Sequence, residues 1–167
     1  MEWNYEYDVV VVGSGNGALT AALCSHDGGA KTLVIEKSSQ FGGTSATSGG
    51  GVWIPNNRYA KAENVDDSDQ DARDYINSVS PEGMIKDELI ETYISEGPRM
   101  VDYLHENSQV KYRNLAHYPD YFPDNTGGKE GNRSMEPEPI FGTELGDDLG
   151  KLREQHPQTA FTMGPIN

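Results

Sequence analysis

Three things are scarce in this sequence: cysteine, positive charge and long apolar runs. The single cysteine, Cys24, excludes a disulfide within the chain and is typical of a reducing compartment, so we predict a cytoplasmic location. Only 13 Lys and Arg stand against 27 Asp and Glu, and the formal charge of -14 argues against nucleic acid or an anionic membrane as a partner. No apolar run is long enough for a transmembrane helix, and the acidic amino terminus does not resemble a signal peptide.

Glycine is plentiful, and a first glycine-rich loop lies at residues 13–18, Gly-Ser-Gly-Asn-Gly-Ala. The apolar run before it predicts a strand over 8–12, buried on both faces because the run is continuous rather than alternating. A helix is expected from 16 to about 26, and a second strand over 31–36, parallel to the first. This order of strand, glycine turn, helix, strand and terminal acid, Glu36, is typical of a dinucleotide-binding unit.

Three small residues of this loop have roles that follow from their size and conformation. Gly13 allows the sharp turn from strand to helix, Gly15 leaves room for a pyrophosphate, and Ala18 allows close packing of helix on strand. The phosphates would meet backbone N–H groups at the positive end of the helix. Glu36 would accept hydrogen bonds from the adenosine ribose, and its charge argues against NADP.

The helix after this loop should pack one face against the strands. Its packed side is expected to contain Leu19, Ala22 and Leu23, and Cys24 beside them is interpreted as a packed residue rather than a reactive thiol. The segment 27–29, Asp-Gly-Gly, is expected to end the helix, because these residues tolerate positive φ.

A second glycine-rich loop, residues 42–51, follows the second strand and contains glycines at both ends with Ser and Thr hydroxyls between them. Such a loop suits a cofactor whose pyrophosphate and isoalloxazine both lie against backbone, which favours FAD over NAD. The alternative is a flexible linker, but the segment 53–55, Trp-Ile-Pro, follows at once and would anchor it.

The rest of the chain predicts helices and then loops. A helix should begin at 68–71 and break at 80–83, and a second should run from about Met84 to Asn107, with Gly97-Pro98 interrupting or kinking it. From Val110 we expect loops, with a short helix marked by Leu145, Leu149 and Leu152. The fold class is therefore α/β, a Rossmann-like FAD-binding domain whose parallel sheet is incomplete at the carboxyl end.

The stretch 8–55 resembles the amino terminus of the fumarate reductase/succinate dehydrogenase flavoprotein superfamily. Its segment 41–50 followed by 53–55 is most similar to the second FAD loop of the 3-ketosteroid Δ1-dehydrogenase branch. Farther on, 118–122 (Tyr-Pro-Asp-Tyr-Phe) and 131–137 (Gly-Asn-Arg-Ser-Met-Glu-Pro) resemble two more segments of that branch, with Asn132 as an insertion. The ordered matches cover nearly the whole chain.

The resemblance implies FAD bound without a covalent link. Some relatives attach FAD to a histidine in the second loop, but the matching position here is Gly43, which has no imidazole. The cofactor-binding residues that we expect come from both glycine loops and from the acid after the second strand: Gly13, Ser14, Gly15, Asn16, Gly17, Ala18, Glu36, Lys37, Gly43, Thr44, Ser45, Ser48, Gly49 and Gly50.

The resemblance also implies a reaction, in which a C2 proton is removed from a 3-ketosteroid and the C1 hydride passes to flavin N5, with an electron acceptor downstream. Tyr121 matches the tyrosine that assists proton abstraction in this branch. A free tyrosine has a pKa near 10, so it is a poor base at neutral pH without help. The competing interpretation is that Tyr121 only packs its proline-rich loop, as Tyr118, Phe122 and Tyr112 are expected to do. Arg133 could pair with Glu136 or Asp120, or position the pocket loop.

Three functions therefore stay open: a 3-ketosteroid dehydrogenase-type enzyme, an enoate reductase of the fumarate type, and a truncated flavin-binding fragment without activity. We expect 1–55 to form the βαβ unit and second FAD loop, 56–109 a helical segment, and 110–167 a loop-rich segment lining the substrate pocket, with the catalytic or cap domain absent. No metal site is expected, because the four histidines lack ligand spacing.

Overall fold

A computed structural model describes residues 4–155 of the chain. The chain divides into two compact units, one formed by residues up to 50 with those from 140, the other by residues 51–139. The end of the predicted loop-rich segment, from His156 onward, lies outside the described residues. Within the described part, no helix is long and apolar enough to cross a bilayer.

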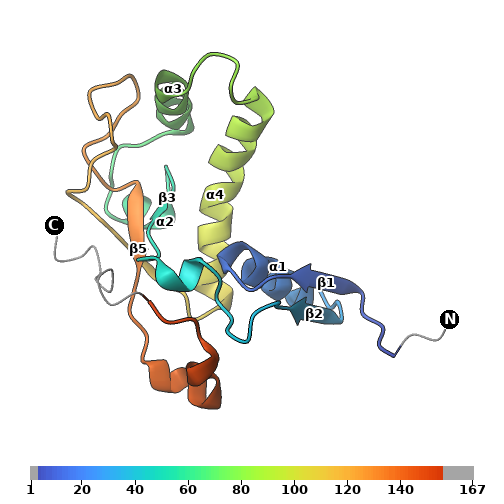
Figure 1. The fold of residues 1–167 in the computed structure, drawn as a ribbon. Coiled ribbons are helices and arrows are strands. Elements are labelled where there is room, and N and C mark those ends of the chain that lie inside the picture. Colours follow the sequence, from blue (N-terminus) through green and yellow to red (C-terminus); the bar gives the residue numbers. More distant parts are fainter. Residues whose placement is uncertain (1–3, 156–167) are drawn as a thin grey trace. The chain divides into compact units, whose positions relative to one another are not determined.

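The first unit begins with the predicted strand, helix and strand: β1 (Val9–Val12), α1 (Asn16–Asp27) and β2 (Thr32–Ile35) (Figure 1). The two strands pair in parallel, as expected, with Val9 opposite Thr32. The helix ends where the glycines predict it, since Gly28 caps it and Gly29 follows with φ of 86°. Local signals therefore specify these three elements.

The expected burial of these elements is found only at Val11 of β1. Val12 is 78% exposed on β1, α1 has no buried residue, and Cys24 is exposed rather than packed. Both faces of a parallel sheet are exposed to solvent unless helices pack against them. The described part of this unit has a two-stranded sheet and one α-helix, which leave most of this apolar surface uncovered.

The second glycine-rich loop continues the first unit. It contains a 3₁₀ turn, η1 (Ser45–Thr47), and is joined to the later part of the unit by a parallel bridge between Phe41 and Leu152. The short helix expected near Leu145 and Leu149 is present as η2 (Gly142–Lys151), which is 3₁₀ rather than α and is broken at Gly146 by a φ of 53°.

The second unit contains an antiparallel sheet that the sequence did not predict. Its strands are β3 (Val52–Trp53), β4 (Tyr112–Asn114) and β5 (Ser134–Pro137), in the order β3-β5-β4. The expectation of loops after Val110 is therefore wrong at two places. These strands have two to four residues, which is too short for an alternating pattern to stand out, and Pro137 ends the last one.

Three α-helices complete this unit: α2 (Arg58–Ala62), α3 (Asp69–Val79) and α4 (Asp87–Asn107). The predicted start of α3 is confirmed, because the Ser68 side chain accepts a hydrogen bond from the Asp71 N–H. The second predicted helix begins three residues later than expected, at Asp87, so Ile85 precedes it.

Pro98 lies inside α4 and does not interrupt it. A proline removes one helical hydrogen bond and costs about 3 kcal/mol in a helix interior. Buried apolar residues on both sides offset that cost, Ile90 and Ile94 before the proline and Val101 and Leu104 after it. Ile90 and Ile94 form a core cluster with Ala72 of α3, which holds the two helices together (Figure 1).

Candidate functional site

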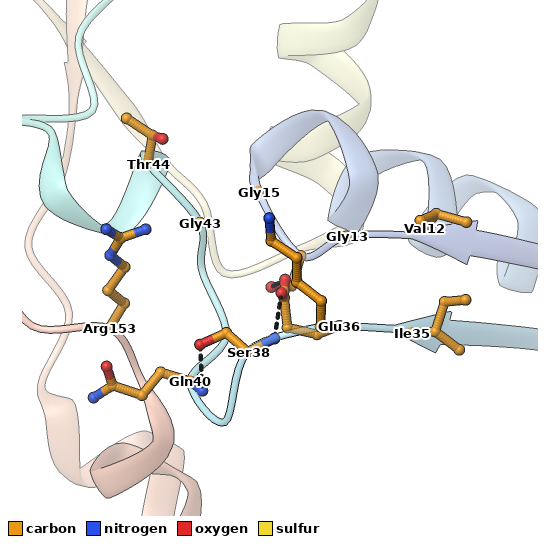
Figure 2. Close-up of a pocket in the computed structure, with 12 residues that line it drawn as sticks. Val12, Gly13, Gly15, Ile35, Glu36, Ser38, Gln40, Gly43, Thr44 and Arg153 are labelled. Atoms are coloured by element: carbon orange, nitrogen blue, oxygen red, sulfur yellow. Dashed lines mark hydrogen bonds between the residues drawn. The ribbon is translucent and has the colours of Figure 1, made fainter.

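A hollow of about 640 Å³ in the first unit lies where β1 and β2 end (Figure 2). Backbone and side chains of both glycine loops and of the residues after β2 form its wall. The lining residues are Val12, Gly13, Ser14, Gly15, Ile35, Glu36, Lys37, Ser38, Gln40, Gly43, Thr44 and Arg153. Seven of them are predicted cofactor-binding residues, so the structure brings the two loops to one place.

Two glycines of this hollow, Gly13 and Gly43, have a positive φ. Gly13 has a φ of 99°, a conformation that favours glycine, and its N–H donates to the Ile35 carbonyl, 2.7 Å away. A Cβ on Gly43 would lie 3.4 Å from the Gly15 Cα, so the two loops approach each other closely. The hollow therefore has a wall of bare backbone, as a pyrophosphate needs.

Ser14 joins the two loops through its buried hydroxyl. The hydroxyl donates to Glu36 Oε2 at 2.5 Å and accepts from the Gly42 N–H at 2.9 Å. The Ser38 N–H donates to the other oxygen, Glu36 Oε1, at 3.0 Å (Figure 2). The Ser14 hydroxyl first, and the Ser38 amide second, lower the pKa of Glu36 below its ordinary value. Glu36 is thus held as an anion at the carboxyl end of β2.

A second contact joins the loops at the amino end of α1. The Asn16 N–H donates to Ser45 Oγ at 3.0 Å, and a Cβ on Gly15 would lie 3.4 Å from the same oxygen. Ser45 therefore satisfies one of the free N–H groups of the first helical turn, close to where the helix dipole favours negative charge.

The other predicted cofactor residues lie outside this lining. Asn16, Gly17 and Ala18 form the first turn of α1. Ser48 Oγ donates to the Ser45 carbonyl and accepts from the Gly50 N–H, so the end of the second loop, with Gly49, folds into a turn of its own. Their contact with a cofactor stays a prediction.

Arg153 is a lining residue that the sequence did not point to. Its backbone N–H donates to the Phe41 carbonyl at 2.9 Å. This contact brings the Arg153 guanidinium, which follows η2, to the hollow, opposite Glu36 in Figure 2. A guanidinium here suits a phosphate-bearing ligand. No local pattern relates Arg153 to Phe41, because the two residues are far apart in the sequence.

A second hollow, of about 310 Å³, lies in the second unit. Tyr121 lines it and is 83% exposed, so this side chain stands free of the packed core. Phe122 is also exposed, whereas Tyr112 is buried as expected. Burial first, and Tyr121 second, raise the pKa of Tyr118 above its ordinary value. The remaining wall is formed by Trp53, Tyr75, Ile76, Val79, Pro119, Asp120 and Ser134.

Arg133 pairs with one of the two expected acids. It contacts Asp120 at 2.8 Å and also Asp67, at 2.7 Å, whereas Glu136 pairs with Arg113. Arg133 is fully buried, so its ion pairs are shielded from solvent, unlike the weak pairs that are common on protein surfaces.

Bare glycine backbone, a helix amino end and a carboxylate at the end of β2 together are typical of a dinucleotide-binding site. In agreement, residues 8–165 match the model of the FAD binding domain family, and the chain belongs to that family. FAD is the cofactor that this family binds, and the bare backbone and the Arg153 guanidinium at this hollow suit its pyrophosphate. The second loop has no histidine for a covalent link, which agrees with non-covalent binding.

The matches to individual proteins are more specific than the match to the family. The chain is 40% identical to a 3-oxosteroid 1-dehydrogenase of Mycolicibacterium smegmatis over 95% of its length, and 38% identical to a 4-oxocyclohexanecarboxylate 2-dehydrogenase of Sinomonas cyclohexanicum over 94%. The crystal structure of 3-ketosteroid Δ1-dehydrogenase from Sterolibacterium denitrificans, in complex with 1,4-androstadiene-3,17-dione, matches 92% of the chain with a TM-score of 0.86 and 41% identity.

These comparisons confirm the resemblance to the 3-ketosteroid Δ1-dehydrogenase branch and the Rossmann-like fold class. The chain spans 28% of the mycobacterial relative, 27% of the Sinomonas relative and 27% of the crystallised chain. The homologous proteins are oxidoreductases by name.

Proposed function

We propose that this chain is the FAD-binding part of an enzyme that dehydrogenates a 3-ketosteroid between C1 and C2. A proton leaves C2, a hydride leaves C1, and a C1=C2 double bond forms, so the substrate loses two electrons. Bound FAD supplies the hydride acceptor, and an electron acceptor reoxidises it. The observation that supports this most is the match to a steroid-bound dehydrogenase over 92% of the chain, at 41% identity.

The position of Tyr121 supports a role in this chemistry. Its phenol is exposed at the wall of a hollow rather than packed, which suits a group that receives a proton from a substrate. Tyr118 and Tyr121 line the same wall, within one proline-stiffened loop. We therefore propose that Tyr121 Oη accepts or relays the C2 proton.

The wall of this hollow favours a neutral apolar substrate. Its lining residues are mostly aromatic or aliphatic, and among them only Asp120 is ionisable at neutral pH. A substrate with a carboxylate needs a cation to replace its hydration. The lining is thus a poor match for the substrate named in the Sinomonas relative, and for fumarate-type enoate reduction, but a good match for a steroid ring.

The test uses the complete protein that contains this chain, normalised to bound flavin. Wild type is assayed with 4-androstene-3,17-dione, with 4-oxocyclohexanecarboxylate and with an enoate, using an artificial electron carrier. We expect dehydrogenation of the steroid, detected as a mass loss of two hydrogens. Turnover of the cyclohexane acid or of the enoate alone would contradict the proposal.

The variant Tyr121→Phe tests the proposed proton transfer. Loss of a positioned acid or base lowers kcat by about 10²- to 10⁴-fold. Tyr5→Phe is the matched control, because Tyr5 is an exposed tyrosine of the other unit, and its kcat should equal that of wild type. An unchanged kcat for Tyr121→Phe would leave only the packing interpretation.

We also propose a cytoplasmic location, which the single cysteine supports.

A further inference from the structure

A buried ion cluster includes Asp120 of the loop 118–122, which contains Tyr118 and Tyr121 and is called the tyrosine loop here. The Arg133 side chain is 1% exposed and lies between two carboxylates, Asp67 at 3% and Asp120 at 2%. Arg133 Nη2 and Nε donate to the two oxygens of Asp67, at 2.7 and 3.1 Å, and Nη1 donates to Asp120 Oδ2, at 2.8 Å. One guanidinium thus binds both acids, which a point charge could not do with the same geometry.

Aromatic rings cover the guanidinium. Its central carbon lies 5.5 Å from the ring centre of Trp53 and 5.7 Å from that of Tyr75, within range of cation–π attraction. The Trp53 indole N–H donates to Asp120 Oδ1 at 2.6 Å. Asp120 is therefore held from one side by a cation and from the other by a neutral donor, as a buried carboxylate requires.

The cluster fixes the backbone next to Tyr121. The Asp120 N–H donates to the Lys129 carbonyl at 2.9 Å, and the Lys129 N–H donates back to Asp120 Oδ2 at 3.0 Å. The Arg133 carbonyl accepts from the Ile54 N–H at 2.8 Å, which ties the arginine to the sheet. Since Tyr121 follows Asp120 directly, these bonds fix the backbone position from which its phenol extends.

We propose that Arg133 is a positioning residue for Tyr121 and acts through Asp120. This inference rests on the function proposed above for Tyr121. The alternative is a cluster that only stabilises the fold, in which case its loss would lower the unfolding temperature without a specific effect on proton transfer. A misplacement of about 1 Å at a reacting group can cost about 100-fold in rate, so the two roles differ measurably.

The decisive variant is Arg133→Lys in the complete protein, normalised to bound flavin. Lysine keeps the charge but cannot hold Asp67 and Asp120 together, so the loop shifts. We expect kcat to fall about 10- to 100-fold, with KM changing less than about threefold. Arg113→Lys is the matched control, because Arg113 also pairs with a buried carboxylate, Glu136, and neither residue lines the second hollow. Its kcat should stay at the wild-type value.

A double-mutant cycle with Tyr121→Phe separates positioning from stability. If Arg133 acts through the phenol, Arg133→Lys lowers kcat by less than about twofold once the phenol is gone. Where Arg133→Lys does not fold, Asp120→Asn enters the same cycle with the same expectation. An equal loss in both backgrounds, or no loss of kcat in wild type, would overturn the positioning role. A wild-type protein without steroid activity would instead refute the proposed function.

Discussion

The variant Ser14→Ala should weaken FAD binding, because Ser14 is the link between the two glycine loops. Its hydroxyl connects Glu36 of the first half of the site to the Gly42 N–H of the second. Without it, the Gly42 N–H, in a buried hydrogen bond, loses its partner, which costs about 1–3 kcal/mol. Part of that cost falls on the free protein, whose loops must then be ordered by the cofactor.

We expect the Kd for FAD to rise about fivefold to thirtyfold, equivalent to about 1–2 kcal/mol. The assay is titration of flavin-free protein with FAD, followed by quenching of flavin fluorescence. Ser38→Ala is the control, since it removes a hydroxyl from the same hollow but keeps the backbone N–H that binds Glu36. Its Kd should stay within about twofold of wild type.

A second readout separates the link from general damage. The Ser14 hydroxyl is the main reason why the pKa of Glu36 is low, so Ser14→Ala should move this pKa up toward its ordinary value. If Ser14→Ala binds FAD as tightly as Ser38→Ala does, the two loops do not depend on this hydroxyl, and our account of the site is wrong.

Two further predictions concern the second unit. Gly131→Ala should destabilise the protein by about 3 kcal/mol or more, because its Cβ would overlap the Ala116 carbonyl oxygen. Gly150→Ala in the first unit is the control and should change the unfolding temperature little, because nothing lies near the added Cβ. Equal stabilities of the two variants would contradict this packing. Burial first, and then Arg58 and Lys111, lower the pKa of His105, so the folded protein favours neutral His105, and its stability should decline as the pH falls from about 7 to about 5. His105→Gln should show a smaller decline in unfolding temperature over that range, and an identical decline would refute the contribution of His105.

Local signals account for the parts of the fold that the sequence predicted. The positive φ of Gly13, the end of α1 at Gly28 and the Ser68 cap of α3 each depend on a few neighbouring residues. A short stretch of sequence is enough to specify such features, and the spacing of the glycine loops and Glu36 is therefore enough to indicate a dinucleotide.

Other features depend on partners that no local pattern shows. Arg133 binds Asp67 from 66 positions away, and Arg153 reaches the hollow because residues 151–153 pair with Phe41. The burial of a side chain also depends on segments distant in the sequence. Cys24 and Val12 are exposed because the described part of their unit has no layer that covers them. Residues whose partners are distant in the sequence, such as Arg153, are thus harder to predict than residues within a local motif.

The central claim is that the two glycine loops bind FAD without a covalent link. The most direct test is to purify the complete protein, precipitate it with acid and analyse both fractions for flavin. We predict a yellow protein that releases FAD into the supernatant in a one-to-one ratio with the chain. A colourless protein that takes up no FAD, or flavin that stays in the pellet, would contradict the account.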